Sequence, residues 1–167
     1  MDLTSLVKEF DAAVGDPRQG LPSDVFLMVS RMTPLVNVDL LIQNDAGQTL
    51  LTWRADQFFG NGWHLPGGVI RFKELAADRI LACAREELRV DVTHDAEPLM
   101  ILETIREPQD RGHLVSLLYR CRLRGELDEQ QRATSDEPAA GAWRWFSQAP
   151  ADMITVQAPY ARFFQSP

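Results

Sequence analysis

Two adjacent carboxylates, Glu86 and Glu87, end a stretch that begins with a glycine turn, WHLPGG, at residues 63–68. Paired carboxylates beside a backbone carbonyl can hold a divalent cation, Mg²⁺ or Mn²⁺, against a pyrophosphate. The two glycines, Gly67 and Gly68, permit unusual backbone angles and let a ligand or ion come close to the main chain. Solvated charge pairs and a plain loop explain each feature alone, but their combination at this spacing favours a metal–diphosphate site.

Residues 74–89 have the hydrophobic period of a helix that would carry the carboxylates. At about 100° per residue, one side collects a buried stripe of Ala77, Ile80, Leu81, Ala84 and Leu88. A different side collects Arg79, Cys83, Glu86 and Glu87. The pattern therefore predicts that both carboxylates share one face with an arginine, away from the apolar stripe.

The order of these residues resembles a Nudix box, G-x5-E-x7-R-E-U-x-E-E-x-G-U, where U is aliphatic. Anchored on Gly68, the pattern places its first glutamate at Glu74 and its late pair at Glu86 and Glu87. Three positions depart from it: Ala82 and Cys83 replace the Arg-Glu pair, and Arg89 replaces the late glycine. The resemblance implies that the carbonyl of Gly67 and the carboxylates of Glu87 and Glu86 hold the metal, and that the two glutamates are catalytic.

Residues 24–165 resemble, within that family, the GDP-mannose mannosyl hydrolase branch, through DVFLMVSRMTPLVNVDLLIQNDAGQTLLTWR before the box and through HLVSLLYRCRL and WRWF after it. The resemblance implies that Asp39 and Arg54 bind substrate, that the substrate is a nucleotide sugar such as GDP-mannose, and that the protein is a homodimer. Arg54 suits a diphosphate, whereas its alternative is a surface arginine at a strand end. Asp39 can accept hydrogen bonds from a sugar or base, or pair with a neighbour inside the sheet.

Several features of that branch are absent. Val69 and Ala82 stand where the branch has arginines, and the loop SDEPAAGAWRW lacks its Gln-His pair, a metal ligand and a base. Arg79 can compensate by reaching a phosphate or by holding Glu86, and Asp136 or Glu137 can supply the missing metal carboxylate.

Three histidines are candidates for the general base. His64 adjoins the glycine turn but suits a structural role, His113 begins a strand at a loop edge, and His94 follows the helix. In an active enzyme, water would attack either phosphorus or the anomeric carbon.

The composition argues against several kinds of binding partner and location. The net charge of −7 argues against a general nucleic-acid surface, because phosphate backbones require a basic patch. Two cysteines without metal-site spacing do not suggest a disulfide framework. The sequence shows no signal peptide and no long apolar run, so we expect a cytoplasmic protein without a membrane span.

The pattern of elements predicts one α/β (α+β) domain over residues 1–167, an α/β/α sandwich with a mixed sheet and the box helix packed on it. Residues 1–33 would form a helical extension, with Ser23 capping its second helix, and residues 34–167 the core. Within the core, 36–44 and 49–54 read as a hairpin across NDAGQ, and the segment at 156–165 as a closing helix.

Two further functions compete with hydrolysis. A binding or regulatory protein that senses a nucleotide sugar without turnover agrees with the lost Arg-Glu and Gln-His pairs. A purely structural module leaves the carboxylates and the glycine turn unexplained.

Overall fold

The computed structural model of this protein describes residues 2–108 and 110–164. Its helical elements are α1 (Leu3–Val14), α2 (Ser23–Ser30), α3 (Ala76–Cys83) with its π-helical continuation η2 (Ala84–Leu88), and the 3₁₀ segments η1 (Pro17–Gln19), η3 (Glu129–Gln131) and η4 (Thr155–Phe163). Its strands are β1 (Leu35–Ile42), β2 (Thr49–Asp56), β3 (Gly60–His64), β4 (Gly67–Val69), β5 (Val92–His94), β6 (Met100–Ile105), β7 (His113–Leu123) and β8 (Trp143–Phe146).

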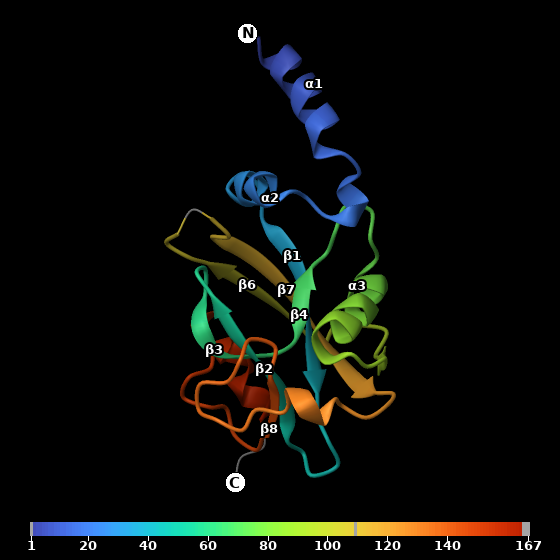
Figure 1. The fold of residues 1–167 in the computed structure, drawn as a ribbon, viewed down its shortest axis with the longest axis vertical. Helices are drawn as coiled ribbons and strands as arrows, with labels where there is room; N and C mark the ends of the chain where they lie inside the picture. The colour runs from blue at the N-terminus through green and yellow to red at the C-terminus, as the bar shows by residue number, and fades with distance from the viewer. Residues whose placement is uncertain (1, 109, 165–167) are drawn as a thin grey trace.

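The strands form two sheets. One has the order β4-β1-β7-β5, with β6 also paired to β7, and the other has the order β3-β2-β8. β1 runs parallel to β7 and antiparallel to β4, so the larger sheet is mixed. Figure 1 shows α3 in front of the larger sheet, with η4 near the smaller one. The predicted α/β sandwich with a mixed sheet is confirmed.

The alternation of β1 divides the core in two. Val38, Leu40 and Ile42 join a cluster that includes Ile80 and Leu88 of the box helix. The neighbouring residue Leu41 belongs instead to a second cluster with Trp63 of β3 and Tyr160 of η4. Because side chains alternate along a strand, Asp39 lies on the same face as Leu41. The strand thus brings a carboxylate to the η4 side of the sheet.

The predicted hairpin is wrong in part. The turn forms, with Asn44 N–H donating to Gln48 O at 3.0 Å and Gly47 in the left-handed region at φ +74°. However, β1 and β2 enter different sheets and share only the isolated bridge Gln43–Thr49. The two strands are fully buried over most of their length and find their partners elsewhere, β1 with β7 and β2 with β3.

The N-terminal helix α1 extends away from the sheets (Figure 1). Asp2 caps it by accepting a 3.0 Å hydrogen bond from the Ser5 amide, and none of its residues is buried. α2 begins at Ser23 itself, behind Pro22 and without a side-chain cap, so the predicted Ser23 cap is wrong. In the described part of the chain, no helix combines the length and apolarity that a membrane crossing needs.

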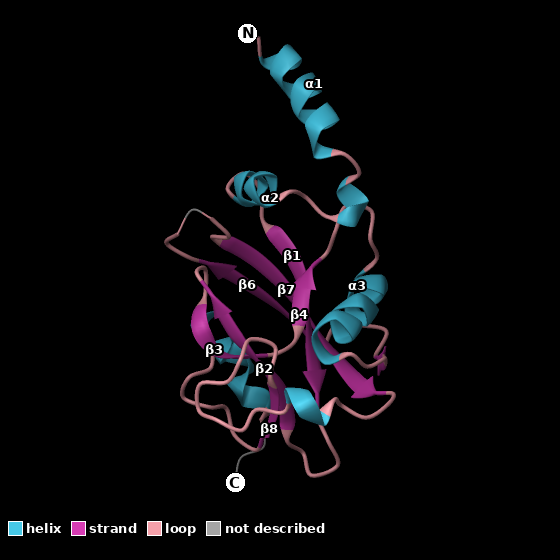
Figure 2. Cartoon of the chain, viewed as in Figure 1, coloured by secondary structure: helices cyan, strands magenta, loops and turns pink. Residues whose placement is uncertain are grey.

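Loops and short elements complete the fold. Most of the segment between β7 and β8 is loop in Figure 2. The predicted closing helix is the 3₁₀ segment η4, with Pro159 inside it. β3 and β4, for which the sequence predicted only loop and turn, place the WHLPGG segment between the two sheets.

Candidate functional site

The glycine turn is held against the centre of the larger sheet. β4 pairs antiparallel with β1, with Gly67 opposite Asp39 and Gly68 opposite Val38. A Cβ on Gly67 would collide with the Val38 carbonyl oxygen, and one on Gly68 would lie 2.9 Å from the Cys83 Sγ. Neither glycine has a positive φ. The expected unusual backbone angles are therefore wrong, and the glycines are needed for close approach.

The box helix changes its geometry just before the carboxylates. α3 ends at Cys83, and the next five residues, Ala84–Leu88, are π-helical. A π turn closes i→i+5 hydrogen bonds and rotates the residues that follow. Glu86 and Glu87 meet different partners. Glu86 shares the predicted face with Arg79, whereas Glu87 contacts Gly67 and Thr52.

Glu87 turns inward to the glycine turn. Its Oε1 accepts a 2.9 Å hydrogen bond from the Gly67 amide, and its Oε2 lies 3.1 Å from the Thr52 hydroxyl. Burial raises the pKa of Glu87 to about 7, although the hydrogen bonds from Gly67 and Thr52 oppose the rise. The side chain is 24% exposed and lies 3.9 Å from His64 Nε2. Among the charged side chains that the structure describes, it has no arginine or lysine within ion-pair distance.

Glu86 points to a separate group. Its carboxylate lies 3.5 Å from Arg79 Nη1 and 3.7 Å from Arg71 Nη2, and its side chain is 54% exposed. Arg79 in turn binds Glu74, with donor–acceptor distances of 2.8–3.1 Å. Burial alone would raise the pKa of Glu74, but the hydrogen bonds from Arg79 and the Arg71 amide outweigh it and lower that pKa.

Arg79 and Cys83 were predicted away from the apolar stripe, yet they are only 5% and 2% exposed. Both side chains lie against Gly68. A Cβ added at Gly68 would lie 2.9 Å from Cys83 Sγ and 3.7 Å from Arg79 Cδ. Of the two roles predicted for Arg79, the geometry favours holding Glu86 and Glu74. Burial also raises the pKa of Cys83 to about 12, which leaves a neutral thiol.

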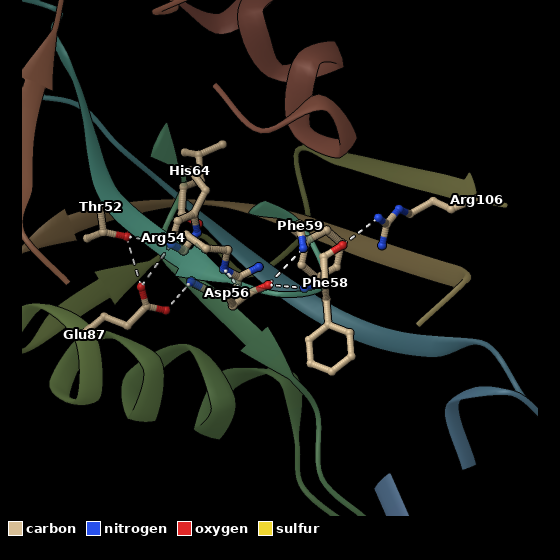
Figure 3. A network of polar contacts seen from close by, with 10 residues as sticks. Thr52, Arg54, Asp56, Phe58, Phe59, His64, Glu87 and Arg106 are labelled. Carbon is tan, nitrogen blue, oxygen red and sulfur yellow. Dashed lines mark hydrogen bonds and ion pairs between the residues drawn. The ribbon is translucent and has the colours of Figure 1, made fainter. Parts of the chain in front are cut away.

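A hydrogen-bonded chain runs from His64 through Thr52 to Glu87 (Figure 3). Nδ1 of His64 lies 2.8 Å from the Leu65 carbonyl oxygen, which can only accept, so this nitrogen carries a proton. Burial lowers the pKa of His64 to about 3, and its Nε2 is therefore an acceptor for Thr52. The single hydroxyl proton of Thr52 can go to Glu87 Oε2 or to His64 Nε2, but not to both at once. With a pKa raised to about 7, the Glu87 carboxyl takes up a proton close to neutral pH when no cation is bound.

This chain removes His64 from the candidates for a general base, since both ring nitrogens are engaged. The other two histidines are bonded elsewhere: His113 to Glu103 at 2.9 Å, and His94 to the Asp95 carbonyl at 2.8 Å. His64 is the one histidine that lines the cleft in the described chain.

The cleft beside Gly67 contains both predicted substrate-binding residues, Asp39 and Arg54. Asp39 is 3% exposed and accepts hydrogen bonds from Tyr160 Oη at 2.7 Å and Gln157 Nε2 at 3.2 Å. Burial raises its pKa to about 6 against these hydrogen bonds. Arg54 Nε lies 3.0 Å from Asp56 Oδ2. The cleft lining thus contains both a buried carboxyl group and a guanidinium group.

The structure adds a residue that sequence reasoning missed. Arg111, in the turn between β6 and β7, lines the same cleft. No motif marked it, because strand pairing alone brings this turn to β2. Phe59 also lines this cleft, and three guanidinium groups lie over its ring. The predicted ligand Glu137 is exposed in the loop before β8 and is not among the residues lining the cleft.

The donors at the glycine turn fit a cation that is shared with substrate. The described residues include no group of three His, Cys, Asp or Glu side chains arranged for a metal ion. Mg²⁺, however, commonly keeps waters and uses one or two carboxylates plus substrate phosphates. Glu87, a partly buried carboxylate with no arginine or lysine partner among the described residues, and the Gly67 carbonyl suit that mode.

Comparison with known proteins agrees with this geometry. A family model described as NUDIX domain matches residues 33–165. Low-salt glycan biosynthesis protein Agl8 of Haloferax volcanii is 36% identical over 77 residues, 46% of this chain, and the match spans about half (49%) of that relative.

Solved structures share the fold at low identity. A MutT NUDIX hydrolase from Burkholderia pseudomallei superposes with a TM-score of 0.62 at 22% identity, covering 80% of this chain and 99% of its own. A NUDIX hydrolase from Nitrosomonas europaea gives a TM-score of 0.58 at 20% identity, covering 79% and 70%. Because the NUDIX domain model matches residues 33–165, most of its length, the chain belongs to the Nudix family.

Proposed function

We propose that this protein is a Mg²⁺- or Mn²⁺-dependent hydrolase of a nucleoside diphosphate derivative, specifically a nucleotide sugar such as GDP-mannose. The observation that carries the proposal is the Glu87 carboxyl. It lies beside Gly67 with its side chain 24% exposed, has no arginine or lysine within ion-pair distance among the described residues, and has a pKa raised to about 7 by burial. A carboxylate in this environment gains most when a cation replaces its proton.

Each residue then has a task in the reaction. The metal, when bound, neutralises charge on the diphosphate and lowers the pKa of a bound water. The Gly67 carbonyl and Glu87 would hold it, and the Thr52 hydroxyl orients the Glu87 carboxylate. Arg54 provides a guanidinium for the phosphate oxygens, and Asp39 provides a buried acceptor for a sugar or base hydroxyl. Because no histidine is free, Glu86 and Glu87 remain our candidates for the catalytic carboxylates.

The sugar part of the proposal has separate support. The relative that shares 36% identity over 77 residues is named for glycan biosynthesis. The polar cleft next to the glycine turn holds Asp39, Asn37 and Ser116, side chains that suit hydroxyl groups. Glu137 as a further metal ligand, the cytoplasmic location and the homodimer also remain proposals. Light scattering after size exclusion would measure the mass of the particle and thus the last of these.

A second candidate function is recognition of a nucleotide sugar without turnover. It is favoured by the small number of metal ligands among the described residues and by the engaged histidines. Both candidates require binding, so they differ only in product formation.

One experiment separates them. The protein is incubated with Mg²⁺ and a panel of nucleotide sugars, and chromatography follows release of free sugar, sugar phosphate and nucleotide. Hydrolysis of at least one substrate, at a rate far above the metal-free control, supports the enzyme. Binding by calorimetry with no product after prolonged incubation would instead support the sensor. The identity of the product also tells whether phosphorus or the anomeric carbon is attacked.

A further inference from the structure

Three guanidinium groups surround one aromatic ring beside the cleft. The Cζ atoms of Arg106, Arg111 and Arg54 lie 4.5, 4.8 and 5.0 Å from the centroid of Phe59. Arg54 comes from β2, and the other two come from the turn between β6 and β7. Figure 3 shows Arg54 and Arg106 on opposite sides of the Phe58–Phe59 segment. Two separate parts of the chain thus concentrate positive charge at one place.

This charge is only partly balanced. Asp56 lies 3.0 Å from Arg54, and its other oxygen accepts the amides of Phe58 and Phe59. Arg106 donates to the Phe58 carbonyl at 2.8 Å, which is a neutral partner. Asp110, on the same turn as Arg111, is already paired with Arg31 at 2.7 Å. Across residues 2–108 and 110–164, Arg111 has no ion pair, so the group keeps an excess of positive charge.

Arg111 is held in this position at a cost. Its φ is +55°, a left-handed backbone that non-glycine residues rarely adopt, and its amide is fixed by a 2.9 Å hydrogen bond to Ser30 Oγ. Its Nε is buried without a hydrogen-bond partner. Burial first, and then the neighbouring charge of Arg54, lower the pKa of Arg111 to about 10. Strain and an unpartnered donor at a functional cleft indicate a ligand that would satisfy them.

Arg111 and Arg54 line the cleft together with Gly67, so a ligand in the cleft can reach both guanidinium groups, and an anion would satisfy them. We propose that Arg111 and Arg54 form an anion subsite that takes a phosphate group, with Arg106 as a positioning residue that covers the Phe59 ring. Only the source of that phosphate, which is the diphosphate of the substrate, rests on the proposed function. A sugar carboxylate would offer similar oxygens, and the test below distinguishes the two.

The direct test measures anion binding without metal. In EDTA at low ionic strength, calorimetry determines the affinity for inorganic pyrophosphate and, separately, for glucuronate. We expect pyrophosphate to bind, and Arg111→Gln and Arg54→Gln each to weaken it at least tenfold. Arg162→Gln is the matched control, since Arg162 is exposed and stacks at 4.9 Å on Phe163 outside the cleft. It should change the affinity less than twofold.

Three results would overturn the subsite. These are no pyrophosphate binding by the wild type at millimolar concentration, an unchanged affinity in Arg111→Gln, or binding of glucuronate in place of pyrophosphate. A failed hydrolysis assay would leave this binding intact. Conversely, absent metal-free binding would leave Glu87-dependent hydrolysis intact, so the two proposals fail separately.

Thermal unfolding separates a ligand-binding Arg111 from a structural one. Without ligand, Arg111→Gln should have an equal or higher Tm, because it removes a crowded, buried charge. Arg111→Gly is the second variant, since glycine adopts φ +55° without strain and should keep the fold. A lower Tm in both variants with unchanged pyrophosphate affinity would mean that Arg111 only supports the phenylalanine side chains, and would overturn the proposal.

Discussion

The amide of Gly67 donates a 2.9 Å hydrogen bond to Oε1 of Glu87, and this contact joins the glycine turn to the end of the box helix. It places Gly67, whose carbonyl is a candidate metal ligand, next to the candidate carboxylate. The same contact is too weak to offset the burial of Glu87, so the carboxyl keeps a raised pKa.

The first prediction concerns stability and pH. Glu87 binds its proton more tightly in the folded protein, with a pKa of about 7 against an ordinary 4.5. Its contribution to stability is therefore full below pH 4.5 and is lost as the pH rises to 7. The Glu87→Gln variant has no proton to lose at this position. Its unfolding free energy minus that of the wild type should therefore rise by up to about 3 kcal/mol between pH 4.5 and pH 7.

Urea unfolding in EDTA between pH 4.5 and 8 measures this difference. Asp39 in the folded protein, and His64 in the unfolded chain with its ordinary pKa of 6.5, titrate in the same range. Both residues are present in the two proteins, so the comparison isolates Glu87. A difference in unfolding free energy that does not vary with pH would contradict the protonated Glu87.

The affinity for Mg²⁺ should depend on pH through the proton on Glu87. A cation must displace it, so we expect the apparent Kd for Mg²⁺, measured with pyrophosphate present, to rise about tenfold for each pH unit below 7. Above pH 8 it should be constant. Calorimetry in two buffers of different ionisation enthalpy would also detect the proton that Mg²⁺ binding releases below pH 7. If no proton is released there, the coupling between Mg²⁺ binding and the Glu87 proton is excluded.

Arg79 should act mainly on the fold. Its guanidinium is 6% exposed and holds Glu74, so Arg79→Ala leaves a buried carboxylate without its partner. We expect a loss of about 3 kcal/mol in unfolding free energy. The control is Arg85→Ala on the same helix, whose ion pair with Asp91 is 63% and 59% exposed and should be worth less than about 1 kcal/mol. Equal losses in the two variants would refute the structural role of Arg79.

Arg89 stands where the Nudix box has its late glycine, and this replacement should lower the stability of the fold. It ends the helix in the left-handed region at φ +57°, where the resembled family has glycine. Arg89→Gly should therefore raise the unfolding free energy by about 0.5–1 kcal/mol, less what is lost with the exposed Asp128 ion pair. Arg89→Ala removes the same ion pair but keeps the strain, so it should be the less stable of the two. The opposite order would show that the backbone strain is negligible.

The fold and the place of the site could be predicted from local patterns. Alternation identified β1, helical period identified the box helix, and the spacing from Gly67 to Glu87 identified which segments meet. These features depend on residues close in sequence. The split of the β1–β2 hairpin depends on which distant strands cover each face, and no local signal reports that.

The details of the site were harder to predict for the same reason. The helical period placed Glu86 and Glu87 on one side, but it could not tell that Glu87 turns to Gly67 while Glu86 pairs with arginines. Nothing in AREEL signals the π turn either. Arg111 reaches the cleft through the pairing of β6 with β7, far from the box in sequence. Cys83 was placed on a polar face, yet the close approach of Gly68 buries it.

The central claim is that Glu87 holds the metal for hydrolysis of a diphosphate bond. The most direct measurement is the rate of nucleotide-sugar hydrolysis at saturating Mg²⁺ for the wild type, Glu87→Gln and the exposed control Glu126→Gln. We predict turnover by the wild type and the control, and a loss of at least about 10²-fold in Glu87→Gln, whose Tm in EDTA is not lowered. Equal rates in Glu87→Gln and the wild type would contradict the claim.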